Sequence, residues 1–275
     1  MAYSYLIPNI LAVPPHYDVT VATTVGRIAP ILRGGEGDIT QTTQVVHEGQ
    51  VVWRDSVEIA VRDGRLVGEE PPPIEWRGRA WENSGYMEIE FRAKDRKPIF
   101  TQQIMSANYS ILHAPGRKSI FTDSPAKFGV PTVIHQIAAF GTYADAFSVI
   151  RLDRARDLGE TLIMINPYRR PIVATVKTAD GRALPRIRIP ALSARDVALA
   201  PLMREGEQEW VGQIQISATN RVICFIAKHS LTDPSVVTDQ EHLDPYRGEP
   251  THLPLSQLAR FWIGHALVRR GWRNE

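Results

Sequence analysis

Residues 161–229 read TLIMINPYRRPIVATVKTADGRALPRIRIPALSARDVALAPLMREGEQEWVGQIQISATNRVICFIAKH. Short apolar runs recur in this stretch between turn-forming sequences such as Asn-Pro-Tyr and Ala-Asp-Gly-Arg. The runs lie at 161–165, 171–176, 186–189, 197–199, 210–216 and 222–226. Runs of this length, separated by turn residues, are typical of small antiparallel β-sandwiches. The stretch therefore predicts such a sandwich, an architecture used more often for binding than for catalysis.

Two local features carry a resemblance to a known class of module. An apolar strand ends in Asn166-Pro167, and a later strand carries Trp210-Val211-Gly212. These features resemble the immunoglobulin-like and fibronectin-type sandwich modules of bacterial proteins. The resemblance covers residues 161–229 only and differs from antibody-type domains, because the stretch has no cysteine pair. The resemblance implies a sandwich architecture and favours a binding function, and it assigns a role to no individual residue of this chain.

The N-terminal half continues the strand-length pattern. Alternating or apolar runs occur at 17–23, 44–46, 51–53, 56–61, 65–67, 86–91, 99–104, 119–121 and 132–137. Glu48-Gly49 and Asp63-Gly64 each separate two runs, which predicts two hairpins. Three prolines in residues 1–16 predict an extended arm there.

The C-terminal segment has a different pattern. Leu255, Leu258, Phe261, Trp262 and His265 recur at helical spacing and would form one bulky face. This face would pack on the chain's own sandwich, on another subunit or at a membrane surface. We therefore predict a mostly β protein with two antiparallel β-sandwich (immunoglobulin-like) domains and a C-terminal amphipathic helix. The expected boundaries are 1–152, 153–252 and 253–275, with the charged run at 151–159 at the junction.

Composition sets further limits. The chain has 275 residues, of which 43% are hydrophobic and 23% charged, and this is ordinary for a soluble globular protein. The formal net charge of +2 does not favour nucleic acid as a partner. No apolar run reaches the roughly 18 residues of a membrane span, and no secretory signal is visible. The single cysteine, Cys224, can form no internal disulfide. A cytoplasmic location is therefore expected.

A metal site is one alternative for the polar segment 229–252. This segment concentrates imidazole and carboxylate groups, which divalent ions use as ligands. The candidate ligands are His229, Asp239, Glu241, His242 and Asp244. The spacing matches neither a His-Glu-x-x-His pair nor a calcium loop, so a solvated, hydrogen-bonded loop is the favoured interpretation and no cofactor is predicted.

A catalytic cleft is the second alternative. His113 and His135 lie beside apolar runs and could act as an acid and a base if they converged with Tyr109, Asp123 and Lys127. Convergence of this kind is not visible in a linear sequence. No nucleophile elbow or phosphate-binding loop is present. Whether the protein is an enzyme therefore stays open at this stage.

Binding residues can be suggested at three places. Arg169 and Arg170 occupy a predicted turn and could grip a carboxylate or phosphate. Phe261 and Trp262 would lie on the bulky face of the C-terminal helix. Three tryptophans are candidate platforms for a carbohydrate or lipid: Trp53, Trp76 and Trp81.

The leading hypothesis is a non-catalytic binding or assembly protein that acts with a protein partner or as a homo-oligomer. The alternatives are a metal-assisted hydrolase, lyase or isomerase that uses the segment 229–252, and a carbohydrate- or lipid-binding sandwich.

Overall fold

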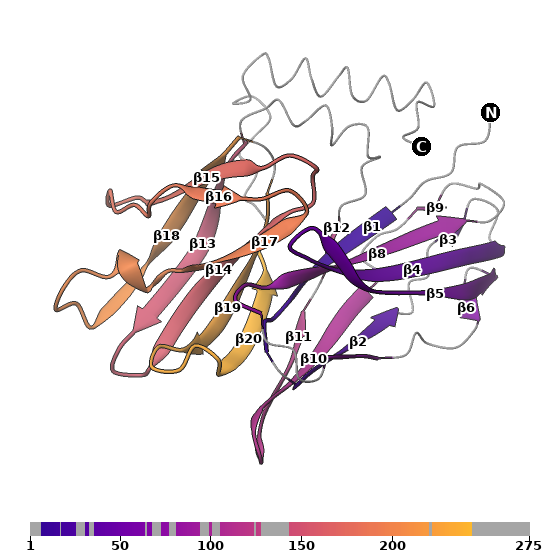
Figure 1. The fold of residues 1–275 in the computed structure, drawn as a ribbon, viewed down its shortest axis with the longest axis horizontal. Coiled ribbons are helices and arrows are strands. Elements are labelled where there is room, and N and C mark those ends of the chain that lie inside the picture. The colour runs from indigo at the N-terminus through magenta and orange to yellow at the C-terminus, as the bar shows by residue number, and fades with distance from the viewer. Residues whose placement is uncertain are drawn as a thin grey trace.

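The computed structural model describes residues 7–16, 18–25, 31–32, 36–63, 65–67, 73–76, 81–93, 99–100, 105–123, 125–127, 143–219 and 222–243. Within these ranges the chain is mostly β and forms several antiparallel sheets (Figure 1), which confirms the expected class. The only helical element described is a short 3-10 turn at Ala200–Leu202. The helix predicted within 253–275 lies outside the described residues.

The larger N-terminal sheet has six strands. Their order is β12 (Ala126–Lys127), β1 (Ile7–Val13), β8 (Gly85–Ala93), β4 (Gly37–His47), β5 (Gln50–Arg62) and β6 (Arg65–Val67). The expectation of an N-terminal arm was wrong for residues 7–13, because β1 pairs with β8 on one side and β12 on the other. Ile10, Leu11 and Ala12 are fully buried, and apolar residues on both faces of a strand require cover on both faces.

A second N-terminal sheet has four strands, in the order β11 (Arg117–Asp123), β10 (Met105–Ala114), β2 (Asp18–Val25) and β7 (Ile74–Trp76). A short pair joins β3 (Ile31–Leu32) to β9 (Ile99–Phe100). Both predicted hairpins are confirmed. Glu48 and Gly49 join β4 to β5 with φ angles of 48° and 79°, the left-handed conformation that tight hairpin turns need, and Asp63 joins β5 to β6 at 52°.

The C-terminal strands form one eight-stranded sheet. Its order is β16 (Ile187–Ile189), β15 (Ile172–Thr178), β18 (Glu209–Ala218), β13 (Tyr143–Asp153), β14 (Leu158–Asn166), β19 (Ile223–Ser230) and β20 (Val237–His242), and β17 (Ser193–Ala198) pairs with β14. Each apolar run predicted between 161 and 229 falls on one of these strands. The sheet already includes β13, so it begins at Tyr143, before the boundary expected after residue 152. The charged run is the turn of the β13–β14 hairpin.

The prediction of a solvated polar loop was wrong for residues 237–242. These residues form β20, which pairs with β19 along most of its length. Val237 and Gln240 are buried whereas Thr238 and Glu241 are exposed, so the segment is polar on one face and covered on the other. A strand with a buried glutamine shows little apolar alternation, which is why the sequence pattern did not reveal it.

Burial differs between the two ends of this sheet. In β15 and β18 every second side chain is buried and the others face solvent, as in a sheet covered on one face. In β14 and β19 nearly every residue is buried, including Cys224, which is therefore a packing residue. Strands β14 and β19 thus have cover on both faces.

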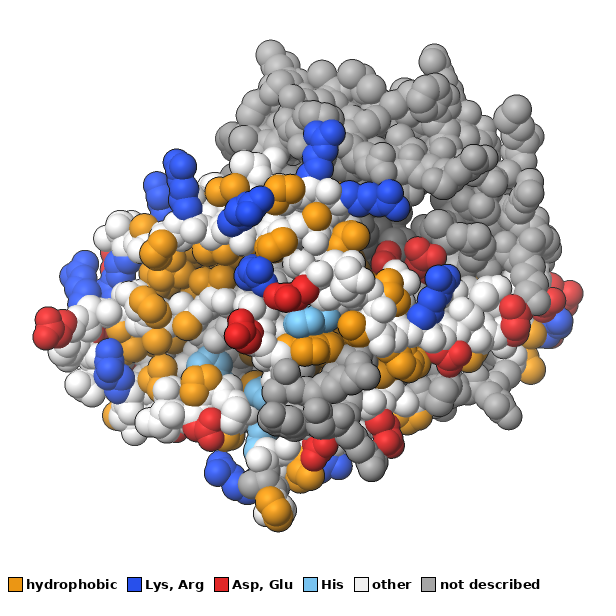
Figure 2. Space-filling view, in the orientation of Figure 1, with side chains coloured by type: hydrophobic (Ala, Val, Ile, Leu, Met, Phe, Trp, Pro, Cys, Tyr) orange, Lys and Arg blue, Asp and Glu red, His pale blue; other side chains and the backbone are white. Residues whose placement is uncertain are grey.

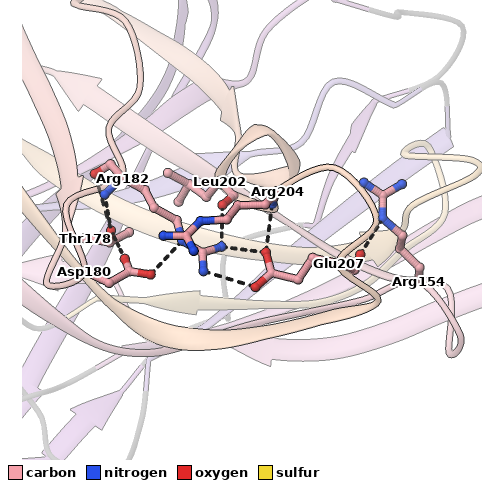
Figure 3. Close-up of polar contacts among 7 residues, drawn as sticks. All are labelled: Arg154, Thr178, Asp180, Arg182, Leu202, Arg204 and Glu207. Carbon is pink, nitrogen blue, oxygen red and sulfur yellow. Dashed lines mark hydrogen bonds and ion pairs between the residues drawn. The ribbon is translucent and has the colours of Figure 1, made fainter.

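Two polar clamps hold the loops of the C-terminal strands. The buried amide of Asn166 donates to the carbonyls of Arg170, Ile189 and Pro190, and this holds the β14–β15 turn against the end of β16. At the other end of β15, the guanidinium of Arg182 donates to Asp180, to both oxygens of Glu207 and to the Leu202 carbonyl (Figure 3). Such forked, charge-assisted contacts fix loop geometry strongly.

Candidate functional site

The polar side chains gather where strands β1–β12, here the N-terminal part, meet strands β13–β20, the C-terminal part. The two parts lie side by side in Figure 1. Strand β20 lies along β11, and β17 packs against β8 and β4. Both β17 and β20 are outer strands of their sheet, so the N-terminal part contacts the group formed by β17, β14, β19 and β20 at its two outer strands. We call this contact region the junction.

The first cluster at the junction is the Gln240 network, formed by Ala12, Tyr109, Asp123, Gln240 and His242. The Gln240 amide donates to the Ala12 carbonyl at 3.2 Å and to Asp123 Oδ2 at 3.3 Å. The Tyr109 hydroxyl donates to the same Ala12 carbonyl at 2.8 Å. The backbone N–H of His242 donates to Asp123 Oδ1 at 3.0 Å. Four strands, β1, β10, β11 and β20, therefore meet at one set of hydrogen bonds.

The Gln240 network is closed to solvent. Tyr109 and Gln240 are fully buried, and Asp123 is 5% exposed. Burial raises the pKa of the Tyr109 hydroxyl well above its ordinary value, and the neighbouring Asp123 charge raises it further. Tyr109 therefore stays a neutral hydrogen-bond donor at physiological pH. The arrangement suits stable attachment of the two parts.

The second cluster is the histidine cluster, formed by His16, His113, His229 and Asp233. The His16 and His113 rings meet edge to face, with centroids 6.1 Å apart. The pKa of His16 is lowered to about 4, mainly by burial and also by the neighbouring His113 and His229, whereas Asp233 opposes the shift. His16 Nε2 is buried and has no hydrogen-bond partner among the described residues. This imidazole therefore remains neutral at physiological pH.

The other two imidazoles of the cluster are already engaged. His113 Nε2 lies 2.8 Å from Ser119 Oγ. His229 Nδ1 lies 2.8 Å from the Ser230 carbonyl, which only accepts, so this nitrogen carries the proton. His229 Nε2, 2.8 Å from Thr161 Oγ1, then accepts from that hydroxyl. Neither nitrogen of His229 is available to a ligand in this arrangement.

The third cluster is the Asp196 contact, where β17 meets the segment before β8. Asp196 Oδ2 accepts from the Ser84 backbone at 3.0 Å and from the Ser84 hydroxyl at 3.1 Å. The Asp196 N–H donates to Asn83 Oδ1 at 3.2 Å. Burial raises the pKa of Asp196 to about 6, although the Ser84 hydrogen bonds oppose the shift. Nearby, the N–H of Gly49 donates to the Leu192 carbonyl at 2.9 Å.

The predicted metal ligands lie on two faces of the β19–β20 pair. Asp239 and Glu241 share one face, where each accepts from the Lys228 ammonium at 3.0 Å. His229 and His242 lie on the opposite face, because side chains alternate along a strand. Among the described residues, no three His, Cys, Asp or Glu side chains are arranged to hold a metal ion. Asp244 lies outside the described residues.

The predicted catalytic residues are brought together only in part. Tyr109 and Asp123 share the Gln240 network. Asp123 pairs with Ala107, and His113 lies six residues further along β10, about 20 Å away in an extended strand. His135 lies outside the described residues, and only the backbone of Lys127 is described. His16, which sequence reasoning missed, replaces these residues as the neighbour of His113.

The predicted binding residues have different positions. Arg169 and Arg170 are exposed in the turn between β14 and β15, as expected for a turn. Trp81 is half-buried and stacks on His47 with ring centroids 4.1 Å apart, and Trp53 packs against the core. The Trp76 side chain, Phe261 and Trp262 lie outside the part of the chain whose side chains are described.

Comparison with known proteins gives no family for this chain. No protein-family model matches it, and no curated protein matches it significantly. No helix among the described residues is long and apolar enough to cross a membrane.

Because the Gln240 network is buried, we expect two Gln→Glu substitutions, one inside the network and one on the surface, to differ strongly in their effect on the unfolding free energy. Gln240→Glu places a second carboxylate beside Asp123 in a buried site, so we expect a loss of about 2–4 kcal/mol of unfolding free energy at pH 7. Gln215→Glu is the matched control, because Gln215 is exposed on β18 and should change stability by less than about 0.5 kcal/mol. Urea unfolding measures both. Equal stability of the two variants would contradict the structural role of the network.

The histidine cluster predicts acid sensitivity. The folded-state pKa of His16 lies below the ordinary histidine value of 6.5, so the stability that this imidazole contributes is present above pH 6.5 and is lost as the pH falls toward 4. The full loss is about 3 kcal/mol. The contribution of Asp196 to stability depends on pH in the opposite direction, because its raised pKa means that stability is lost as the pH rises from about 4 to 6.

Urea unfolding at pH 4.0–7.5 separates the two contributions. His16→Gln should remove the acid-side loss, and Asp196→Asn should remove the opposing slope. An unchanged pH profile in His16→Gln would show that the imidazole is not buried in a neutral form.

Proposed function

We propose that this chain is a non-catalytic binding or assembly protein built from β-sandwich modules, the second of them immunoglobulin-like. The observation that carries the proposal is the use of the reactive side chains at the junction. Tyr109, Asp123 and Gln240 are buried and hydrogen-bonded to one another, and His229 has both ring nitrogens engaged. Groups held in this way fix the relative position of two parts and are closed to a substrate.

The burial pattern supports the sandwich architecture for the C-terminal part. In two facing sheets, each inner face is apolar and each outer face is polar unless it is covered by something else. Strands β15 and β18 follow this rule, with Ile214 and Ile216 buried and Gln213 and Gln215 exposed. Strands β14 and β19 depart from it, because nearly all of their residues are buried and both of their faces are therefore covered. A rigid body of two modules would present its loops and outer faces at fixed positions.

The two rival functions have less support. A metal-assisted enzyme needs carboxylates and imidazoles on one side, whereas Lys228 neutralises Asp239 and Glu241 on the face opposite His242. A sugar-binding platform needs an open indole face, and the Trp81 ring is stacked on His47 and lies close to Gly85. Neither rival is favoured by a specific contact among the described residues.

Light scattering coupled to size-exclusion chromatography tests the assembly role. We expect the full chain to be an oligomer, because Phe261 and Trp262 would form a bulky apolar face in the helix that the sequence predicts for the C-terminal segment. Phe261→Ala/Trp262→Ala should dissociate the oligomer. Arg269→Ala/Arg270→Ala, a double substitution in the same segment, should leave it intact. A full-length chain that is monomeric at all concentrations would remove the assembly role.

A further inference from the structure

The histidine cluster joins three segments of the chain that are far apart in the sequence. His16 lies between β1 and β2, and His113 lies near the end of the β10–β11 hairpin. His229 ends β19, and Asp233 lies in residues 231–236, which we call the β19–β20 turn. Figure 2 shows histidine side chains grouped close to the boundary between the two parts, in the lower half of the view. The cluster therefore connects the hairpin and the turn at one end of the junction.

The cluster holds more groups that can be positive than carboxylates that balance them. His16 interacts electrostatically with His113, His229 and Asp233. Asp233 also interacts with Arg117 of β11, which is always charged. One carboxylate therefore faces a guanidinium and three imidazoles, and each proton taken up by an imidazole adds repulsion to the cluster.

Other charged groups around the cluster are directed elsewhere. The Asp157 carboxylate, in the turn between β13 and β14, accepts hydrogen bonds from Ser230 and Thr232. Asp18 and Lys118 both lie opposite Leu112 on the β2–β10–β11 sheet.

His113 hydrogen-bonds to Ser119, the residue after Lys118, and side chains alternate along a strand. Asp18 and Lys118 therefore lie on the face of the hairpin that points away from the histidines.

His16 has no described acceptor for a second ring proton. Its Nε2 atom is buried and has no hydrogen-bond partner among the described residues. The ring of His113 stands edge to face against it, with centroids 6.1 Å apart. A proton on Nε2 would create a buried cation without a hydrogen bond, beside two further imidazoles. Such a cation is unstable until the ring reaches water.

The Asp196 contact lies at the opposite edge of the same group of strands. Strand β17 carries Asp196, and the order β17, β14, β19, β20 places it three strand spacings, about 14 Å, from β20. Asp196 accepts from Ser84, and its raised pKa means that the folded state binds its proton more readily than the unfolded chain does. Acid therefore acts against one edge of the junction and in favour of the other.

We propose that the histidine cluster is a latch that acid releases. Protonation of His16 separates the β19–β20 turn from the end of the β10–β11 hairpin, while the Asp196 contact stays closed and acts as the hinge. This device does not depend on what the protein binds, so it goes beyond the proposed function.

The size of the effect follows from the two protonation states. The pKa of His16 is about 4 in the closed latch, and the released imidazole regains the ordinary value of 6.5. The ratio of released to closed protein is therefore about 30-fold higher at pH 5 than at pH 7.5.

Double electron–electron resonance on the full-length protein tests the proposal. Spin labels at Lys118→Cys and Pro234→Cys occupy exposed positions of the hairpin and of the turn, and the native Cys224 is buried. Dilution with unlabelled protein removes distances between copies. We expect one narrow distance distribution at pH 7.5 and a longer, broader one at pH 5. Labels at Glu82→Cys and Ala198→Cys, beside the Asp196 contact, should keep their distance at both pH values.

Two substitutions identify the imidazole responsible. His16→Gln carries no titrating group, so the Lys118–Pro234 distance should stay short at pH 5. His47→Gln is the matched control, because it removes an imidazole outside the cluster and should leave the release unchanged. Circular dichroism at pH 5 should show that the strands are retained.

Four results would overturn the proposal. They are an unchanged Lys118–Pro234 distance at pH 5, an equal lengthening of both label pairs, release that persists in His16→Gln, and loss of the β signal at pH 5. A monomeric full-length chain would contradict assembly and leave this experiment unaffected, so the two proposals fail separately.

Discussion

The buried amide of Gln240 is the contact on which the rest of the structure depends. It reaches from β20 into the N-terminal part and binds a backbone carbonyl of β1 and the Asp123 carboxylate of β11. A buried polar group costs free energy unless its partners are in place, so this contact favours one relative position of the two parts over all others. Apolar surfaces alone would allow sliding, because dispersion and hydrophobic contacts have little directionality.

The other two junction clusters respond to protons in opposite ways. The neutral imidazole of His16 favours the closed junction at higher pH, whereas the buried carboxyl of Asp196 favours it at lower pH. The junction therefore combines a contact that is weakened by acid with one that is weakened by base. The two effects oppose each other between pH 4 and 6.5. The unfolding free energy of the whole protein therefore changes less with pH than either cluster alone would make it change.

Much of the fold was predictable from local pattern. The strands between residues 161 and 229 were predictable from the spacing of apolar runs, and the Glu48-Gly49 turn from its residue types. Strand β1 and strand β20 were missed for opposite physical reasons: prolines in and beside β1 obscured a mostly apolar strand, and a buried glutamine made the covered strand β20 look like a loop. His16 was invisible because its burial depends on β10 and β19, which are distant in the sequence. Arg169 and Arg170 were predictable as a turn, because Asn-Pro precedes them and the next apolar run follows directly.

We infer that this polar junction makes the two β-rich parts unfold together as one cooperative unit. Differential scanning calorimetry of the full chain at pH 7 tests it most directly. We expect a single transition whose calorimetric enthalpy equals its van't Hoff enthalpy, because the Gln240 amide and the Asp196 carboxylate find hydrogen-bond partners in the N-terminal part, at Asp123 and Ser84. Two resolved transitions, each with its own enthalpy, would contradict it and would show that the two parts fold independently.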